Sequence, residues 1–129
     1  MKFLSIYKTV ERTTPPSQEE MARMGQLIEE AQKGGWLLST EGCLPTALGV
    51  RVRVSNGDFA VVDGPFTESK EQVGGFAILK AESREEAIQL TKKFLNVVGQ
   101  GECEVRQLFE AGQGQCTERS AAEAAVAKA

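Results

Sequence analysis

The chain of 129 residues contains no histidine, and this absence excludes much of common enzyme chemistry. Ser–His–Asp triads, Cys–His pairs and most catalytic zinc sites all need an imidazole. The phosphate-binding patterns G-x-x-x-x-G-K-[ST] and G-x-G-x-x-G are also missing. We therefore expect neither a metal site nor a bound cofactor. Any proton transfer near neutral pH falls to a carboxylate, lysine, tyrosine or cysteine.

Cysteine is scarce: Cys43, Cys103 and Cys116 are the three in the chain, and none has C-x-x-C spacing. An odd number without that spacing favours reduced thiols over a disulfide framework. The apolar run from Phe3 to Tyr7 is too short for the core of an export signal, and no run approaches the ~20 apolar residues of a membrane span. These absences predict a cytoplasmic protein with no membrane partner.

A surplus of positive charge is missing as well. The formal net charge is −3, and the basic residues are scattered singly apart from Lys92 and Lys93. Binding to phosphate backbones needs clustered lysine and arginine, so we expect no nucleic-acid partner. The apolar content of 41% and the charged content of 26% are ordinary for one soluble globular domain of this length.

Two helices are predicted from their first turns. Ser17 with Glu20, and Ser83 with Glu86, have the S-x-x-E spacing of a capping box, in which side chains satisfy free N–H groups at a helix start. Apolar residues at helical spacing follow each box. Glycines end both helices, at Gly34-Gly35 and within 99–101, because glycine adopts the left-handed C-cap conformation easily.

The remaining core segments have the composition or alternation of strands. Asn56-Gly57 is a strong hairpin signal between two of them. The element order is then β-α-β-β-β-β-α-β, which predicts an α+β fold with both helices on one face of a largely antiparallel sheet. This is a ferredoxin-like split βαβ arrangement with an extra hairpin. The expected strands are residues 2–8, 36–42, 48–54, 59–63, 74–81 and 102–110.

The strands have apolar residues on both faces. Phe3 and Tyr7 alternate with Leu4 and Ile6, and the same pattern recurs at residues 76–79. Helices can cover one face only, so we predict a face-to-face homodimer in which a second copy covers the other. The core domain spans residues 1–110. Residues 111–129 form a tail of different composition, with Ser120 and Glu123 before an Ala-rich stretch that favours a short helix.

A rigid corner with clustered charges is the main candidate site. Asp63 precedes Gly64-Pro65, and Glu68, Lys70 and Glu71 follow within a few residues. Clustered titratable groups beside a cleft are where perturbed pKa values arise, so Asp63, Glu68 and Glu71 are candidate acid/base residues. The alternative is structural, because Asp-Gly-Pro is good turn chemistry by itself.

Four further side chains are candidate ligand-binding groups. Arg51, which shares a strand face with Arg53, and Lys70 could hold an anionic group, although a surface ion pair is the alternative. Glu41 lies near the end of a predicted strand. Tyr7 could line an apolar pocket together with Trp36, or both aromatic side chains could belong to the core.

The segment "VVDGPFTESKEQVGGFAI" resembles the signature of the YCII-related, or DGPF-domain, family. The likeness extends over roughly residues 1–110, through "MKFLSIYK", "GGWLLSTEGCLP", "RVRVSNGDFAVVDGP" and "CEVRQLFE". The tail lies outside it. The positions that match the signature are Asp63, Gly64, Pro65, Phe66, Glu68, Lys70, Glu71, Gly75 and Phe76.

This resemblance implies a dimeric α+β barrel, two ferredoxin-like protomers packed sheet to sheet, in a bacterial cytoplasmic protein. In better-known branches a His–Asp pair is the proposed catalytic group, and a chain without histidine cannot carry it. Some members are linked to extracytoplasmic-function sigma factors, which implies a regulatory role.

Three functions follow from the sequence. The first is a module that binds a small ligand or regulates, with a sigma-factor link as one form. The second is an enzyme that acts on a small organic molecule by carboxylate acid/base chemistry. The third is a purely structural dimer. We favour the first because no nucleophile, metal set or cofactor motif is present.

Overall fold

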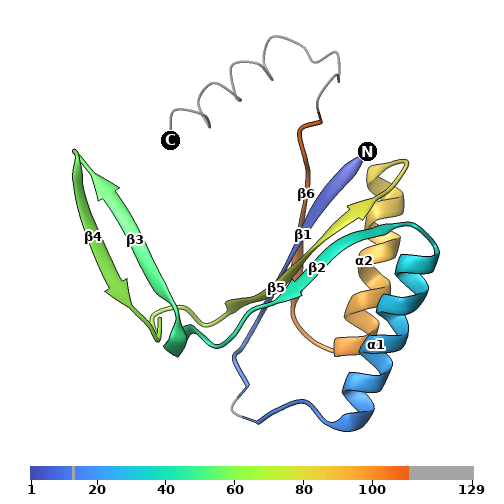
Figure 1. Cartoon of the computed structure of the whole chain (residues 1–129), viewed down its shortest axis with the longest axis horizontal. Helices are drawn as coiled ribbons and strands as arrows, with labels where there is room; N and C mark the ends of the chain where they lie inside the picture. The colour runs from blue at the N-terminus through green and yellow to red at the C-terminus, as the bar shows by residue number, and fades with distance from the viewer. Residues whose placement is uncertain (13, 111–129) are drawn as a thin grey trace.

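The computed structural model describes residues 1–12 and 14–110, and its element order is the predicted one (Figure 1). The predicted tail helix lies outside the described residues. The elements are β1 (Lys2–Thr9), α1 (Gln18–Lys33), β2 (Leu37–Gly42), the short 3₁₀ helix η1 (Thr46–Leu48), β3 (Val50–Ser55), β4 (Asp58–Asp63), β5 (Gln72–Lys80), α2 (Arg84–Val98) and β6 (Glu102–Gln107).

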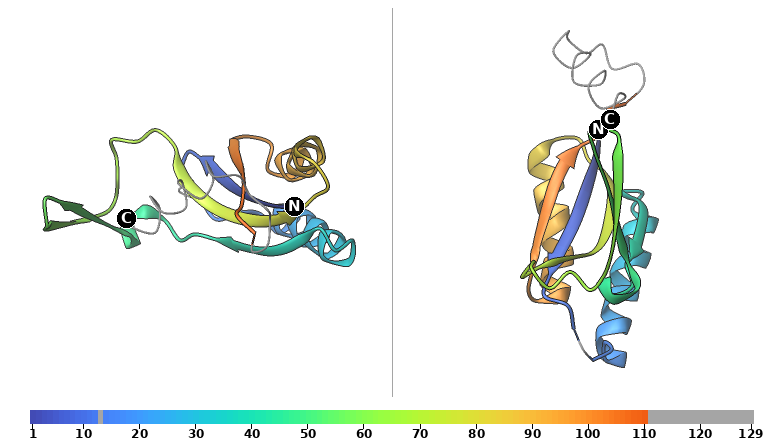
Figure 2. Two further views of the ribbon diagram at one scale, coloured as in Figure 1. Left: turned by 90° about the horizontal axis from the view of Figure 1, so that it is seen from above. Right: turned by 90° about the vertical axis from the view of Figure 1, so that its left-hand side faces the viewer.

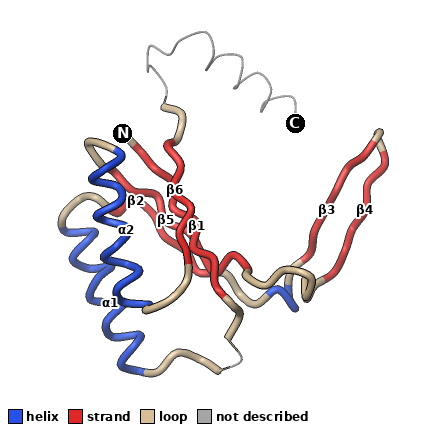
Figure 3. The backbone as a smooth tube through the Cα atoms, turned by 180° about the vertical axis from the view of Figure 1, so that it is seen from behind, coloured by secondary structure: helices blue, strands red, loops and turns tan. Residues whose placement is uncertain are grey.

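Four strands form one antiparallel sheet in the order β2-β5-β1-β6. Both helices lie on the same side of this sheet, and the β3–β4 hairpin lies on the opposite side (Figures 1 and 3). The α+β class and the ferredoxin-like arrangement with an extra hairpin are therefore confirmed. The predicted sheet-to-sheet dimer is not tested by a single chain and stays a prediction.

The helix ends form where their sequences predict. The Ser17 hydroxyl accepts a hydrogen bond from the Glu20 backbone N–H at 3.1 Å, and the Ser83 hydroxyl accepts one from the Glu86 N–H at 3.1 Å. Gly99 ends α2 in the left-handed conformation with a φ of 81°. These local contacts set the two helices at fixed positions along the sheet.

The hairpin forms its own two-stranded sheet, separate from the main one. Asn56 and Gly57 both have positive φ angles, 52° and 84°, as a tight two-residue turn requires. Several predicted boundaries are wrong: β5 begins at Gln72, β6 ends at Gln107, and Leu48 is in η1, so that β3 begins at Val50. Pro45 opens that turn, and the Leu48 N–H donates to the Pro45 carbonyl at 3.0 Å, so the chain bends where the strand was expected to start.

The hairpin extends away from the rest of the molecule (Figure 2). Its cross-strand pairs Val52 with Val61 and Val54 with Phe59 put their side chains on one face, where 66% of Val61 and 76% of Phe59 are exposed. A two-stranded hairpin is marginally stable alone, so its position depends on the contacts at its base.

The core lies between the main sheet and the helices and contains Phe3, Leu79, Ala81, Ala87 and Leu90. The other face of the sheet has no covering element among the described residues, and its apolar side chains are partly exposed. The strand register puts Leu4 beside Ile78 and Ile6 beside Phe76 on that open face. The two-faced strand pattern that predicted a dimer is therefore present in three dimensions.

Candidate ligand-binding site

A cavity of about 390 Å³ lies between the helices and the sheet. Residues from β1, β2, β5, β6, both helices and the segment before β2 line it, and most are apolar. Its volume is within the range of ~300–1,000 Å³ that is usual for small-molecule sites. The larger lining side chains include Tyr7, Leu27, Ile28, Trp36, Leu90 and Phe94.

Several polar groups in the cavity wall already have protein partners. The Thr40 hydroxyl donates to the Phe76 carbonyl at 3.0 Å, and the Thr91 hydroxyl donates to the Ala87 carbonyl at 2.8 Å. Burial raises the pKa of the Cys103 thiol, which also lines the cavity, so the thiol stays protonated at neutral pH. This wall suits an apolar ligand and supplies no thiolate nucleophile.

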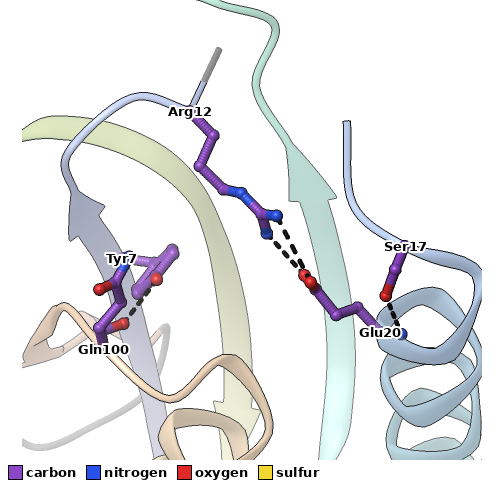
Figure 4. Close-up of polar contacts among 5 residues, drawn as sticks. All are labelled: Tyr7, Arg12, Ser17, Glu20 and Gln100. Atoms are coloured by element: carbon purple, nitrogen blue, oxygen red, sulfur yellow. Dashed lines mark hydrogen bonds and ion pairs between the residues drawn. The ribbon is translucent and has the colours of Figure 1, made fainter. Parts of the chain in front are cut away.

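Tyr7 stands at the border between this inner cavity and a second, outer cavity of about 430 Å³. Its ring packs edge-on against Phe94, with ring centroids 5.0 Å apart and an interplanar angle of 84°. Its hydroxyl donates to the Gln100 carbonyl at 2.7 Å (Figure 4). The ring is therefore fixed from two sides in the position where it lines both spaces.

An ion pair lies at the outer cavity. Arg12, from the loop after β1, donates to the Glu20 carboxylate in the first turn of α1, with an Nη1–Oε2 distance of 2.6 Å (Figure 4). The hydrogen bond lowers the pKa of the Glu20 carboxyl and raises the pKa of Arg12. Both groups are therefore ionised across the physiological range.

The Asp-Gly-Pro-Phe corner lies elsewhere, at the base of the hairpin. The Gly64 N–H donates to the Gly49 carbonyl at 3.0 Å. This hydrogen bond joins the chain segment that enters the hairpin to the segment that leaves it. A Cβ at position 64 would collide with the backbone carbonyl of Thr46. Only glycine therefore fits at this close approach. Phe66 is buried behind it, with 9% of its surface exposed.

Arg51 joins the hairpin to this corner. Its guanidinium carbon lies 3.9 Å from the centroid of the Phe66 ring, a cation–π contact, and the same guanidinium forms an ion pair with Glu68. The hydrogen bond from Arg51 lowers the pKa of the Glu68 carboxyl. A carboxylate with a lowered pKa is a weaker base, so this environment is the reverse of the one that tunes a general base to neutral pH.

The candidate residues from the sequence are thus divided between two places. Tyr7 and Glu41 line the inner cavity, although the register of Glu41 with Phe76 directs its Cβ toward the open face. Arg51 and Glu68 meet at the hairpin base. Neither cavity is lined by the charged corner residues, namely Asp63, Glu68, Lys70 and Glu71. The catalytic assignment of Asp63, Glu68 and Glu71 stays a prediction.

Sequence reasoning missed Arg12 and Glu20 as site residues. Glu20 was recognised for its capping role only, and Arg12 lies in a loop without periodicity. The two residues are eight apart in the sequence and separated by a loop, so no local pattern shows their pairing. Tyr7 and Trp36 were considered as pocket residues, and both line the inner cavity.

Over residues 1–12 and 14–110, no group of three or more histidine, cysteine, aspartate or glutamate side chains is placed to hold a metal ion. Over the same residues, none of the helices combines the length and the apolar character that crossing a membrane requires.

The fold and the cavity define a ferredoxin-like α+β protein with an apolar space between its sheet and its helices. Residues 1–111 match the model of the YCII-related domain, and the chain belongs to that family. It is 33% identical to an uncharacterized protein of Rhizobium meliloti (strain 1021) over 101 residues, which are 74% of this chain and 82% of the relative.

Among solved structures, the chain is similar to 5-chloro-2-hydroxyhydroquinone dehydrochlorinase from Burkholderia phenoliruptrix AC1100, in a complex with 2,5-dihydroxybenzoquinone. The TM-score is 0.47 and the sequence identity is 17%, and the match covers 89% of this chain and 100% of that chain.

Proposed function

We propose that this protein is a small-ligand-binding module, and that its ligand is an apolar or aromatic molecule held between the sheet and the two helices. The observation that carries the proposal is the inner cavity of about 390 Å³ with its largely apolar wall. A packed core leaves few voids larger than a water molecule, so a space of this size is a feature of the fold that a ligand would fill.

The side chains of the wall support an aromatic ligand in particular. Trp36, Phe94 and Tyr7 contribute rings, and aromatic pairs add about 0.5–1.5 kcal/mol beyond the area that they bury. The polar groups of Thr40 and Thr91 are bonded to backbone carbonyls, so a ligand rich in hydrogen-bonding groups would find few open partners there. Burial of apolar surface is then the main source of affinity.

The alternative, an enzyme with carboxylate acid/base chemistry, has less support. Glu68 is tied to Arg51 with a lowered pKa, and Asp63 and Glu71 are absent from the walls of both cavities. A base must come within hydrogen-bond reach of the proton that it removes. A regulatory role linked to a sigma factor stays a prediction, and ligand binding is the input that such a role would use.

We also propose that the working form is a homodimer. Two apolar surfaces on each chain support it: the open face of the sheet, with Leu4, Ile6, Phe76 and Ile78, and the exposed face of the hairpin. The hairpin lies on the same side of the sheet as the open face (Figure 1). In a two-fold arrangement each hairpin would pack on the partner, which would bury both surfaces.

The decisive experiment fills the cavity. Ala77 lines it from β5, so Ala77→Phe puts a ring into the space that the ligand would occupy. The neutral naphthalene dye prodan, whose emission shifts to the blue in apolar surroundings, is titrated into the wild-type chain and the variant. We expect Ala77→Phe to weaken prodan binding at least about tenfold, and a cooperative thermal melt of the variant shows that it is folded.

Ala60→Phe is the matched control, because it adds the same ring to the exposed hairpin. It should leave prodan binding as in the wild type. Equal affinity for all three proteins would show that the dye binds elsewhere, and the proposed cavity function would be wrong.

A further inference from the structure

The two cavities adjoin each other and have part of their walls in common. Tyr7, Met24, Ile28 and Val98 line both, so the two spaces meet at these four side chains. The inner wall is apolar, whereas the outer wall carries the ion pair between Arg12 and Glu20. A ligand that uses both spaces therefore has an apolar body and a polar end.

The charges in the walls show what that polar end is. Three charged residues line the two cavities: Arg12 and Glu20 in the outer one and Glu41 in the inner one. Glu41 shares its register position with Phe76, on the side of the sheet away from the helices. Arg12 is thus the single positive charge in either wall, and Glu20 is bound to it.

Glu20 lies in the first turn of α1, and this position distinguishes it from Arg12. The backbone and the hydroxyl of Ser17 also contribute to the lowered pKa of Glu20, as expected for the glutamate of a capping box. A glutamate released from Arg12 would remain in the first turn of α1, where the helix dipole favours a negative charge. Arg12 has no such second carboxylate among the residues that line the two cavities.

We propose that the ligand carries one anionic group, of the carboxylate class, which takes the place of Glu20 on Arg12 while its apolar body fills the inner cavity. This inference rests on the proposed function and names the chemical class of its ligand. The guanidinium fork fits a carboxylate with two parallel hydrogen bonds. About half of each partner in the Arg12–Glu20 pair is exposed, at 46% and 45%, and exposed pairs contribute little to stability, so the exchange of one carboxylate for another costs little.

The test uses three probes with the same ring and a different charge: naphthoate, naphthamide and naphthylmethylammonium. Each is titrated calorimetrically into the full chain at low salt. We expect naphthoate to bind about five- to tenfold more tightly than naphthamide, and the ammonium probe to bind most weakly. Arg12→Gln should abolish the preference for naphthoate and leave naphthamide affinity unchanged, which also shows that the variant is folded.

Two more variants sharpen the result. Glu20→Gln removes the competing carboxylate and should tighten naphthoate binding about two- to fivefold. Arg23→Gln removes a positive charge from α1 at a position outside both cavity walls, and it should change nothing.

The outcomes separate the two proposals. Equal binding of naphthoate and naphthamide, or tightest binding of the ammonium probe, would overturn the role of Arg12 while the cavity function stands. A loss of naphthoate affinity in Arg23→Gln as large as that in Arg12→Gln would also overturn it, because the effect would then be one of net charge. If none of the three probes binds the wild-type chain, both proposals fall.

Discussion

The inner cavity and the Asp-Gly-Pro-Phe corner are built in opposite ways. The cavity is assembled from side chains that are far apart in the sequence and individually ordinary, such as Tyr7, Trp36 and Phe94. The corner is one continuous, conspicuous segment, and its charged and aromatic groups contact the hairpin: Arg51 covers Phe66 and pairs with Glu68. The segment that identifies the family thus holds the architecture together, while the space that can bind a ligand is formed by packing.

This difference teaches how to interpret a motif without known chemistry. A cluster of charges in sequence suggests a site, but the charges of this corner line neither cavity, and Glu68 pairs with Arg51 of the hairpin. Residues that line a cavity are better candidates for a ligand-binding site, and a cavity can be recognised only in the folded chain. The predictions below test whether the corner is architecture and whether the exposed hairpin has a partner.

The largest effect is expected at Gly64. Gly64→Ala places a Cβ against the backbone carbonyl of Thr46, and a backbone group cannot move aside without shifting η1. We expect a loss of at least about 4 kcal/mol in the free energy of unfolding, measured by urea denaturation. Gly25→Ala is the control, because a Cβ there meets nothing within 4 Å and alanine favours a helix by up to about 1 kcal/mol.

A Gly64→Ala protein that is as stable as the wild type would contradict the architectural role of the corner. Glycine would then be there for another reason, and the segment would again be a candidate for a binding site in its own right.

A smaller loss of folding stability is expected from changes to apolar residues, and it should be larger in the core than on the hairpin. Leu79 is 3% exposed in the core, so Leu79→Ala should cost about 3 kcal/mol from lost burial and the void that remains. Val61 on the hairpin is 66% exposed, so the polar isostere in Val61→Thr should cost less than about 0.5 kcal/mol in the dilute monomer. Both are measured by urea denaturation.

The same hairpin variant tests the homodimer. If a second copy covers the hairpin, sedimentation should show a dimer of the wild type at micromolar concentration and weaker self-association of Val61→Thr. Leu79→Ala is the control. The Leu79 side chain faces the helices, so this variant changes the core without removing a direct contact to the partner. A wild-type monomer at these concentrations would rule out the dimer.

The sequence predicted the fold well because its signals are local. Capping boxes at Ser17 and Ser83 and the Asn56-Gly57 turn each determine a few backbone hydrogen bonds without help from distant residues. The boundary at Leu48 was wrong because alternation continued through a segment that Pro45 turns into a 3₁₀ helix. Alternation reports which face a residue would occupy in a strand, and it does not report where the strand begins.

The cavity was less predictable for a physical reason. An apolar face on a helix has the same periodicity whether it is packed tightly or leaves a space, so the pattern of α1 and α2 gives no volume. The Arg12–Glu20 pair needs a loop and a helix start to meet, and neither residue has a sequence signal for the other. For Tyr7 and Trp36 the sequence leaves both a pocket and a core position open, because large aromatic side chains occur in both.

The smallest predicted effect concerns the charge pair at the corner. The pKa of Glu68 is lowered in the folded chain by Arg51, so its contribution to stability is complete above the pKa of an ordinary glutamate, about 4.3, and is lost as the pH falls through the lower folded value. Glu68→Gln should therefore melt at a slightly lower temperature than the wild type at pH 7. The difference in melting temperature should shrink as the pH falls below about 4.3 and vanish below the lowered pKa of Glu68.

Glu71→Gln removes a carboxylate from the same segment without touching Arg51, and it separates the specific pair from a general effect of net charge. Neither variant should change prodan binding, because neither position lines a cavity. A Glu68→Gln protein with normal stability and altered ligand binding would contradict the architectural role of the corner and make it part of the ligand site. The corner would then contribute to the ligand site through a route that the single chain does not contain, such as the partner in a dimer.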